Sequence, residues 1–68
     1  MIEFRIDIMQ ALEKRGWTQQ KIRENKLLGQ SSYYAMKNNS KVPGLAGINA
    51  LCYMLNMQPG SFLKYVPD

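Results

Sequence analysis

The side chains best suited to chemistry in this 68-residue chain lie between residues 18 and 39. This segment reads TQQKIRENKLLGQSSYYAMKNN, and its second half opens with polar amide and hydroxyl groups. Such groups hydrogen-bond to base edges in the DNA major groove, while Lys and Arg side chains bind phosphates. The first residues of a helix in that groove are the ones that meet the bases. The segment therefore favours two short helices joined by a tight turn, with the second helix suited to the groove.

The residue inventory argues against an enzyme. The chain has no His to act as a general base or to activate a Ser or Cys nucleophile. Glu3 and Asp7, at i and i+4, are expected on an exposed helix face, and no glycine-rich phosphate loop is present. A single Cys without His excludes an internal disulfide and a zinc site, so Cys52 is expected to be a small core residue. We expect no catalysis, no cofactor and no metal.

Composition and charge point to one basic domain. Nine Lys and Arg residues against five acidic residues give a formal charge of +4 and a pI near 9.5. This balance favours nucleic acid or another acidic partner, although many small basic proteins bind neither. A 46% hydrophobic content is enough for one core, over residues 1–68. No apolar run approaches the roughly 18 residues that span a bilayer, and no signal-peptide pattern opens the chain, so a cytoplasmic location is expected.

The first two helices are predicted from apolar spacing and capping residues. Spacings of three and four predict a helix over Ile2–Lys14, and Gly16 follows in a position that ends helices. The apolar stripe of this helix comprises Phe4, Ile8, Ala11 and Leu12. Thr18 is the expected N-cap of a helix over Gln19–Asn25, whose inward residue is Ile22. Trp17, just before that cap, has the spacing of a hydrophobic staple with Ile22.

The next helix is the candidate reader. Residues 26–29 form the turn before it, and the helix is expected over Gln30–Asn38 with Tyr33 and Met36 facing inward. The polar residues 38–41 form the following turn.

The last two helices complete an all-α, compact five-helix bundle. A helix over Leu45–Leu55 carries no charge and should be the most buried segment, with Gly47 marking a close helix approach. Its expected inward residues are Leu45, Ile48, Leu51, Cys52 and Leu55. Pro59 occupies the first position of a helix over Pro59–Tyr65, in which Phe62 and Leu63 face inward. We find no run that alternates at period two and expect no strand.

Together these features resemble the Cro/lambda-repressor-type helix-turn-helix family, often called the XRE family. The matching residues of the helix pair are Thr18-Gln19, Ile22, Ser31-Ser32, Tyr33 and Met36. The stretch LCYMLNMQPGSFL, residues 51–63, is similar to the family's fourth helix, a short polar break and the start of its fifth helix. The resemblance covers nearly the whole chain, and it is strongest for short regulators that consist of the DNA-binding domain alone.

The resemblance implies a small transcriptional regulator, expected to be a repressor, whose third helix binds the major groove of double-stranded DNA. The base-reading set is Gln30, Ser31, Tyr34 and Ala35. The set that contacts the DNA backbone is Thr18, Gln19, Lys21, Arg23, Ser32, Lys37, Asn38 and Lys41. A Gln side chain can bond bidentately to adenine, whereas Ala35 offers only an apolar contact, for example to a thymine methyl. The basic side chains would supply the salt-dependent part of binding.

Three positions depart from the family's usual pattern. Arg23 stands where the family has a small Ala, Leu27 where it has the turn Gly, and Gly29 where it has a capping Ser or Thr. Because Leu is strained at positive φ, the turn is expected to take another path, with Asn25 as its left-handed residue.

The resemblance also leads to a homodimer, because one short helix buries too little surface for tight binding. Two-fold pairing on half-sites about 34 Å apart is the usual arrangement. The candidate contact residues are exposed apolar side chains: Ile6, Met9, Tyr53, Met54 and Tyr65. No small-molecule effector is evident. The alternative is a protein-interaction module, such as an antitoxin-like or antirepressor-like adaptor, that keeps the fold with weak or no DNA binding. The sparse base-reading set favours this alternative, since only Gln30 is a strong reader.

Overall fold

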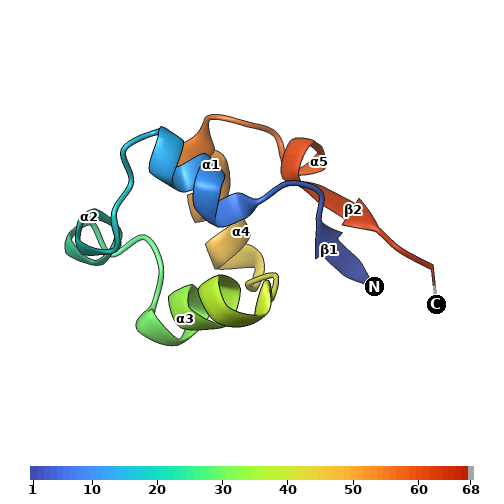
Figure 1. Cartoon of the computed structure of the whole chain (residues 1–68), viewed down its shortest axis with the longest axis horizontal. Helices are drawn as coiled ribbons and strands as arrows, with labels where there is room; N and C mark the ends of the chain where they lie inside the picture. Colours follow the sequence, from blue (N-terminus) through green and yellow to red (C-terminus); the bar gives the residue numbers. More distant parts are fainter. Residues whose placement is uncertain (68) are drawn as a thin grey trace.

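The computed structural model describes residues 1–67, which form five helices and a two-stranded sheet (Figure 1). In chain order the elements are β1 (Ile2–Phe4), α1 (Ile8–Lys14), α2 (Gln19–Glu24), α3 (Gln30–Asn39), α4 (Leu45–Leu55), α5 (Pro59–Phe62) and β2 (Leu63–Tyr65). Within residues 1–67, each helix is too short or too polar to cross a membrane. The five predicted helices are therefore confirmed, and the all-α class is approximate because of the sheet.

The core is formed by side chains from every helix, with α4 lying between α1 and α3 (Figure 1). Its buried members are Ile8, Leu12, Ile22, Tyr33, Met36, Leu51, Met54, Leu55 and Phe62. Ile22 holds α2 on this core, and Tyr33 and Met36 hold α3, as their spacing predicts. The helix pair is thus fixed by a few apolar anchors, which leaves most of its polar side chains at the surface.

The two ends of the chain form an antiparallel ribbon, although no strand was predicted. Ile2 pairs with Tyr65, Glu3 with Lys64 and Phe4 with Leu63. The helix predicted over Ile2–Lys14 begins only at Ile8, and the one predicted over Pro59–Tyr65 ends at Phe62.

Two physical causes explain these shorter helices. The side chain of Asp7 accepts a hydrogen bond from the backbone N–H of Gln10 at 3.1 Å, so Asp7 is the N-cap that starts α1. Residues 2–6, IEFRI, alternate apolar and charged side chains, which is the pattern of a half-buried strand. The prediction that no run alternates at period two was therefore wrong.

The rotation of α4 differs from the prediction at two positions. Leu45 is 76% exposed although it was expected in the core, because the first turn of α4 extends past the core. Met54 was expected to be exposed but is 3% exposed, since it packs with Leu51 and Leu55. The indole Nε1 of Trp17 also donates to the Met54 carbonyl at 3.0 Å. Leu45 and Met54 thus exchange their predicted places between core and surface.

Gly47 does mark a close approach, but its neighbours are side chains rather than a helix. A Cβ at this position would lie 2.5 Å from Cβ of Pro43 and 3.2 Å from a methyl group of Leu28. Gly47 therefore lets the loop before α4 and the turn before α3 pack on α4. This contact supports the segment that presents α3.

Candidate nucleic-acid interface

The turn between α2 and α3 is a Schellman motif with Lys26 in the left-handed conformation. The N–H of Leu27 donates to the carbonyl of Ile22 at 3.1 Å, and the N–H of Lys26 donates to that of Arg23 at 3.1 Å. Lys26 has φ 54°, whereas Asn25, the predicted left-handed residue, has φ −89°. The prediction for Asn25 was wrong because the Schellman motif places the left-handed residue one position after the C-cap, and Asn25 is the C-cap. The Nδ2 of Asn25 donates to the Lys21 carbonyl at 2.8 Å.

The same motif ends α1, with a glycine at the left-handed position. Gly16 has φ 79°, and its N–H donates to the carbonyl of Glu13 at 2.9 Å. The N–H of Trp17 donates to the carbonyl of Leu12 at 3.0 Å. In both motifs the next residue, Trp17 or Leu27, is a half-buried apolar side chain packed against the core. Leu27 thus occupies the apolar position of the motif and is not strained.

A direct hydrogen bond links the N-terminus of α2 to α3. Nε2 of Gln19 donates to the hydroxyl of Tyr34 at 2.8 Å. The ring of Tyr34 in turn meets that of Tyr33 edge-on, with centroids 5.7 Å apart. Because Tyr33 is a core anchor, this chain of contacts connects the surface of α3 to its buried face.

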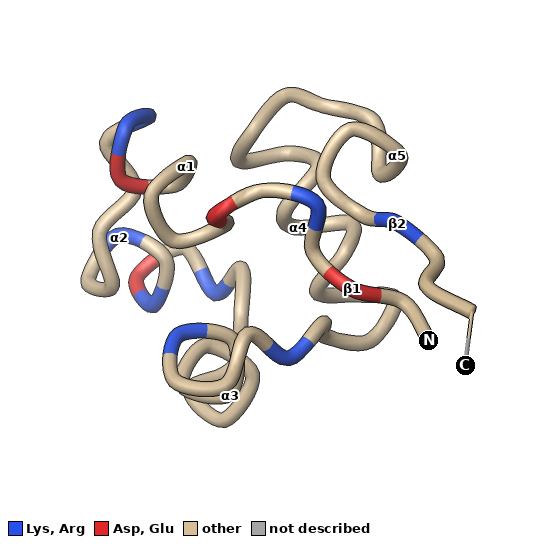
Figure 2. The backbone as a smooth tube through the Cα atoms, turned by 45° about the vertical axis from the view of Figure 1, so that its right-hand side comes forward, with Lys and Arg blue, Asp and Glu red and all other residues tan. Residues whose placement is uncertain are grey.

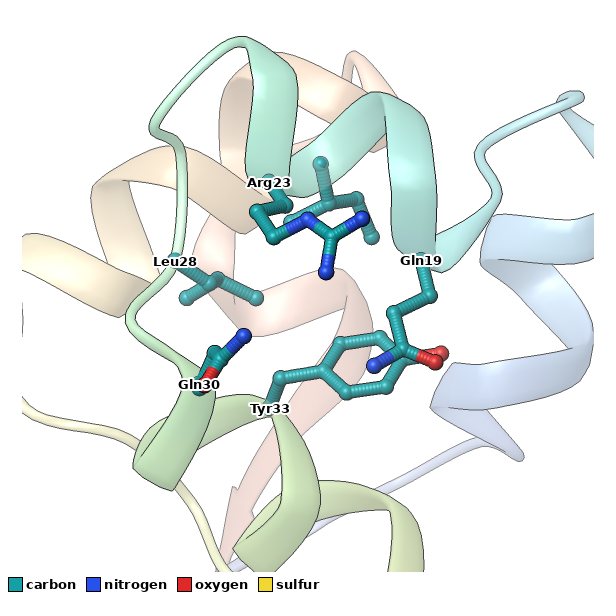
Figure 3. A pocket seen from close by; sticks show the side chains of 6 residues that line it. Gln19, Arg23, Leu28, Gln30 and Tyr33 are labelled. Atoms are coloured by element: carbon teal, nitrogen blue, oxygen red, sulfur yellow. The ribbon is translucent and has the colours of Figure 1, made fainter.

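Between the two helices lies a cavity of about 10 Å³, roughly the space of one water molecule (Figure 3). Its lining residues are Gln19, Ile22, Arg23, Leu28, Gln30 and Tyr33. Figure 3 shows the Arg23 side chain extending from α2 toward the middle of these residues, above the Tyr33 ring. Arg23 is exposed, so the long side chain is accommodated at the rim rather than between the helix backbones.

Three of the four predicted base-reading residues are exposed. Gln30, Ser31 and Tyr34 lie on the outer side of α3, while Ala35 is half-buried. Gly29 is the N-cap of α3, and no side-chain cap bond is present among the described residues. A hollow of about 200 Å³ separates this part of α3 from the loop before α4. Its lining residues are Ser31, Ser32, Ala35 and residues 41–44. Ala35 therefore faces a hollow, and Gln30 and Ser31 stand at the exposed start of the helix.

The predicted backbone-contact residues fall into two groups. Lys21, Arg23, Lys37, Asn38 and Lys41 are exposed on α2, α3 and the loop after α3. Thr18, Gln19 and Ser32 have structural constraints. The Thr18 hydroxyl accepts from the backbone N–H of Lys21 at 3.2 Å, which confirms the predicted N-cap. Gln19 is half-buried and bonded to Tyr34, and Ser32 is half-buried.

The net charge of the chain is concentrated on one segment. Residues 18–44, here named the recognition segment, hold five of the nine basic residues and only one acidic residue, which gives +4. The rest of the chain has four basic and four acidic residues and is formally neutral. Figure 2 shows the basic positions on α2, α3 and the adjoining loops. The positive surface and the candidate base readers therefore belong to the same part of the fold, which suits a polyanion with readable edges.

Comparison with known proteins identifies a family over nearly the whole chain. Residues 7–68 match the family model described as Cro/C1-type HTH DNA-binding domain. The resemblance noted from the helix pair and the C-terminal stretch is thereby confirmed. No curated protein and no solved structure was found to match the chain.

Proposed function

Because this chain belongs to the Cro/C1-type helix-turn-helix family of DNA-binding domains, we propose that it regulates transcription by placing α3 in the major groove. The observation that carries this proposal is the recognition segment, which holds all of the net charge of +4 together with the exposed side chains of Gln30 and Ser31. Positive charge attracts the phosphates, and the amide and hydroxyl groups read the bases. We propose repression as the mode of regulation, because it requires only that the protein occupy its DNA site.

In this arrangement Gln30 is the main base reader. It is the first residue of α3 and is exposed, so its amide can donate to and accept from one adenine edge. Ser31 and Tyr34 add hydrogen-bonding hydroxyls on the same side of the helix. Lys37 and Lys41 lie at the end of α3 and in the following loop, where they can bind phosphates.

We further propose that the protein acts as a homodimer. A single helix-turn-helix module buries little DNA surface, and two modules on neighbouring half-sites raise both affinity and specificity. Of the predicted dimer contacts, Tyr53 and Tyr65 are exposed, Ile6 and Met9 are half-buried, and Met54 belongs to the core. The dimer proposal therefore does not include Met54, and its exposed candidates are two tyrosines on different elements, Tyr53 on α4 and Tyr65 on β2.

The proposal is tested by the salt dependence of binding to a random-sequence duplex of about 30 bp, three helical turns. If the five basic side chains of the recognition segment each contact a phosphate, the slope of log K against log salt is about −4.5 per subunit. Affinity per subunit then falls about 500-fold between about 50 and about 200 mM salt.

Two matched variants locate the contact. Lys37→Ala, on α3, should make the slope shallower by about 0.9 per subunit, while Lys14→Ala, on α1, should leave it unchanged. Gln30→Ala should relax discrimination at one base pair of a selected site without changing the slope. No binding by the unmodified chain at the lower salt concentration would refute the proposal and favour the protein-interaction module.

A further inference from the structure

Exposed apolar side chains gather at the open end of the ribbon. Met1 is 65% exposed, Ile2 49% and Tyr65 68%. Ile2 and Tyr65 are direct cross-strand partners, and the N–H of Val66 donates to the Met1 carbonyl at 2.8 Å, which extends the ladder by one pair. Ile2 and Tyr65, here named the ribbon patch, therefore lie beside one another on one face although they come from opposite ends of the chain, while the side chain of Met1 alternates to the other face.

The ribbon patch continues an apolar face that is covered only in part. Residues two apart on a strand, and residues directly opposite on its partner, point to the same side. Ile2, Phe4, Leu63 and Tyr65 hence share one face, while Glu3 and Lys64 share the other. Phe4 and Leu63 are half-buried against the core, whereas Ile2 and Tyr65 extend past it. Adjacent exposed apolar side chains that continue a buried apolar face form a contiguous patch, and contiguous apolar patches mark protein contacts when they are large.

We propose that the ribbon patch binds the same patch of a second copy of this chain, an inference that rests on the proposed DNA-binding function. The charge distribution favours this contact. The two strands carry one acidic and one basic side chain, Glu3 opposite Lys64, so the side chains of the strands add no net charge to the contact. The recognition segment, at +4, would repel its own copy and stays free for DNA.

The geometry of the molecule favours the same end. The longest axis measures 37 Å, with the ribbon at one end, α2 at the other and α3 along one side between them (Figure 1). A two-fold axis at the ribbon end, perpendicular to the long axis and parallel to the direction in which α3 is displaced from it, places both α3 helices on one side. One turn of B-DNA, ~34–36 Å, is comparable to the 37 Å long axis, so two copies joined at their ribbon ends are long enough to reach two successive major grooves.

Two further observations single out the ribbon. The other large exposed apolar residues include Leu45 and Tyr53, which are eight residues apart on α4, about 12 Å along the helix, and do not form one patch. In addition, β1 lies outside residues 7–68, the region that the family model matches. The family match therefore covers β2 but not its partner strand β1.

The test compares two tyrosines with equal exposure. Tyr65→Glu places a charge in the ribbon patch, and Tyr53→Glu places the same charge on α4, where the tyrosine is 69% exposed. Sedimentation velocity of the protein alone, with unfolding curves to verify that both variants fold, gives the dimer dissociation constant. Tyr65→Glu should raise this constant about tenfold or more, and Tyr53→Glu should leave it unchanged. Ile2→Lys, on the paired strand, should reproduce the effect of Tyr65→Glu.

The outcomes separate this inference from the proposed function. A chain that binds the random-sequence duplex but remains a monomer at all concentrations would overturn the inference and leave the function standing. Dimers that dissociate with Tyr53→Glu and persist with Tyr65→Glu would also overturn it, because the contact would then lie on α4. Dimers that dissociate with Tyr65→Glu, in a chain that binds no duplex at low salt, would support the contact and refute the function.

Discussion

Replacing Lys26 by glycine should stabilise the protein. Lys26 is exposed and holds φ 54° in the Schellman motif that ends α2. For any residue that has a Cβ atom this conformation is strained, because Cβ approaches the following carbonyl oxygen. The chain itself provides the comparison, since the equivalent position after α1 is Gly16, at φ 79°. Lys26→Gly therefore places a glycine at the left-handed position of the turn before α3, as Gly16 already does after α1.

The expected gain is the difference between two effects. Relief of the left-handed strain is worth about 1–2 kcal/mol. Glycine also gives the unfolded chain more freedom, which costs about 0.4–1 kcal/mol. The net stabilisation is then about 0.5–1 kcal/mol, because the exposed Lys26 side chain gives up little packing. For a domain of this size, that amounts to a rise in Tm of about 2–8 °C.

Thermal unfolding followed by circular dichroism measures this change, and Asn25→Gly is the matched control. Asn25 has φ −89° and donates its amide to the Lys21 carbonyl at 2.8 Å. Glycine at that position relieves no strain and removes a hydrogen bond, so Tm should fall. The opposite order, in which Asn25→Gly raises Tm and Lys26→Gly lowers it, would refute the argument and make Asn25 the left-handed residue of the turn.

Two further changes test how the recognition segment is supported. Thr18→Ala removes the acceptor for the backbone N–H of Lys21 and should lower the free energy of unfolding by about 0.5–2 kcal/mol. Thr18→Ser keeps a hydroxyl acceptor and should retain most of that free energy. Equal Tm values for the two variants would contradict the role of Thr18 as N-cap. Gly47→Ala would bring a Cβ within 2.5 Å of Pro43 and should cost about 1–3 kcal/mol by urea unfolding. Gly60→Ala, where no described atom lies within 4 Å of an added Cβ, is the control; a Gly47→Ala variant as stable as Gly60→Ala would show that the loop yields freely.

The parts of the fold that depend on local sequence could be predicted. The Thr18 cap, the Ile22 anchor of α2 and the inward pair Tyr33 and Met36 each follow from spacing within one or two helical turns. The bounds of α4 were predicted correctly for the same reason. These elements form the helix pair and its support, and the site residues assigned to that pair stay a prediction.

The remaining errors arise where the outcome depends on distant residues or lacks a local signal. The strand over Ile2–Phe4 has a local signal, the alternation of residues 2–6, but the signal is short, and the partner strand that decides the structure is about 60 positions away. Because α4 has no charged residue, its sequence does not show which side faces solvent, and Leu45 and Met54 were exchanged. The left-handed conformation of Lys26 was not predicted. In a Schellman motif the left-handed residue is fixed by its position after the helix end, even when a residue that tolerates positive φ better, such as Asn25, stands next to it.

The three departures from the usual family pattern prove to be compatible with a well-formed helix pair. Arg23 lies at the rim of the small cavity rather than between the helix backbones (Figure 3). Leu27 fills the apolar position of the Schellman motif, because the left-handed residue precedes it. Gly29 has ordinary extended dihedral angles, φ −68° and ψ 156°, so its glycine is not needed for the turn. Since it contributes no capping side chain among the described residues, the first N–H groups of α3 remain available to a DNA acceptor. The departures therefore change how α3 is held and capped, while its polar start stays exposed.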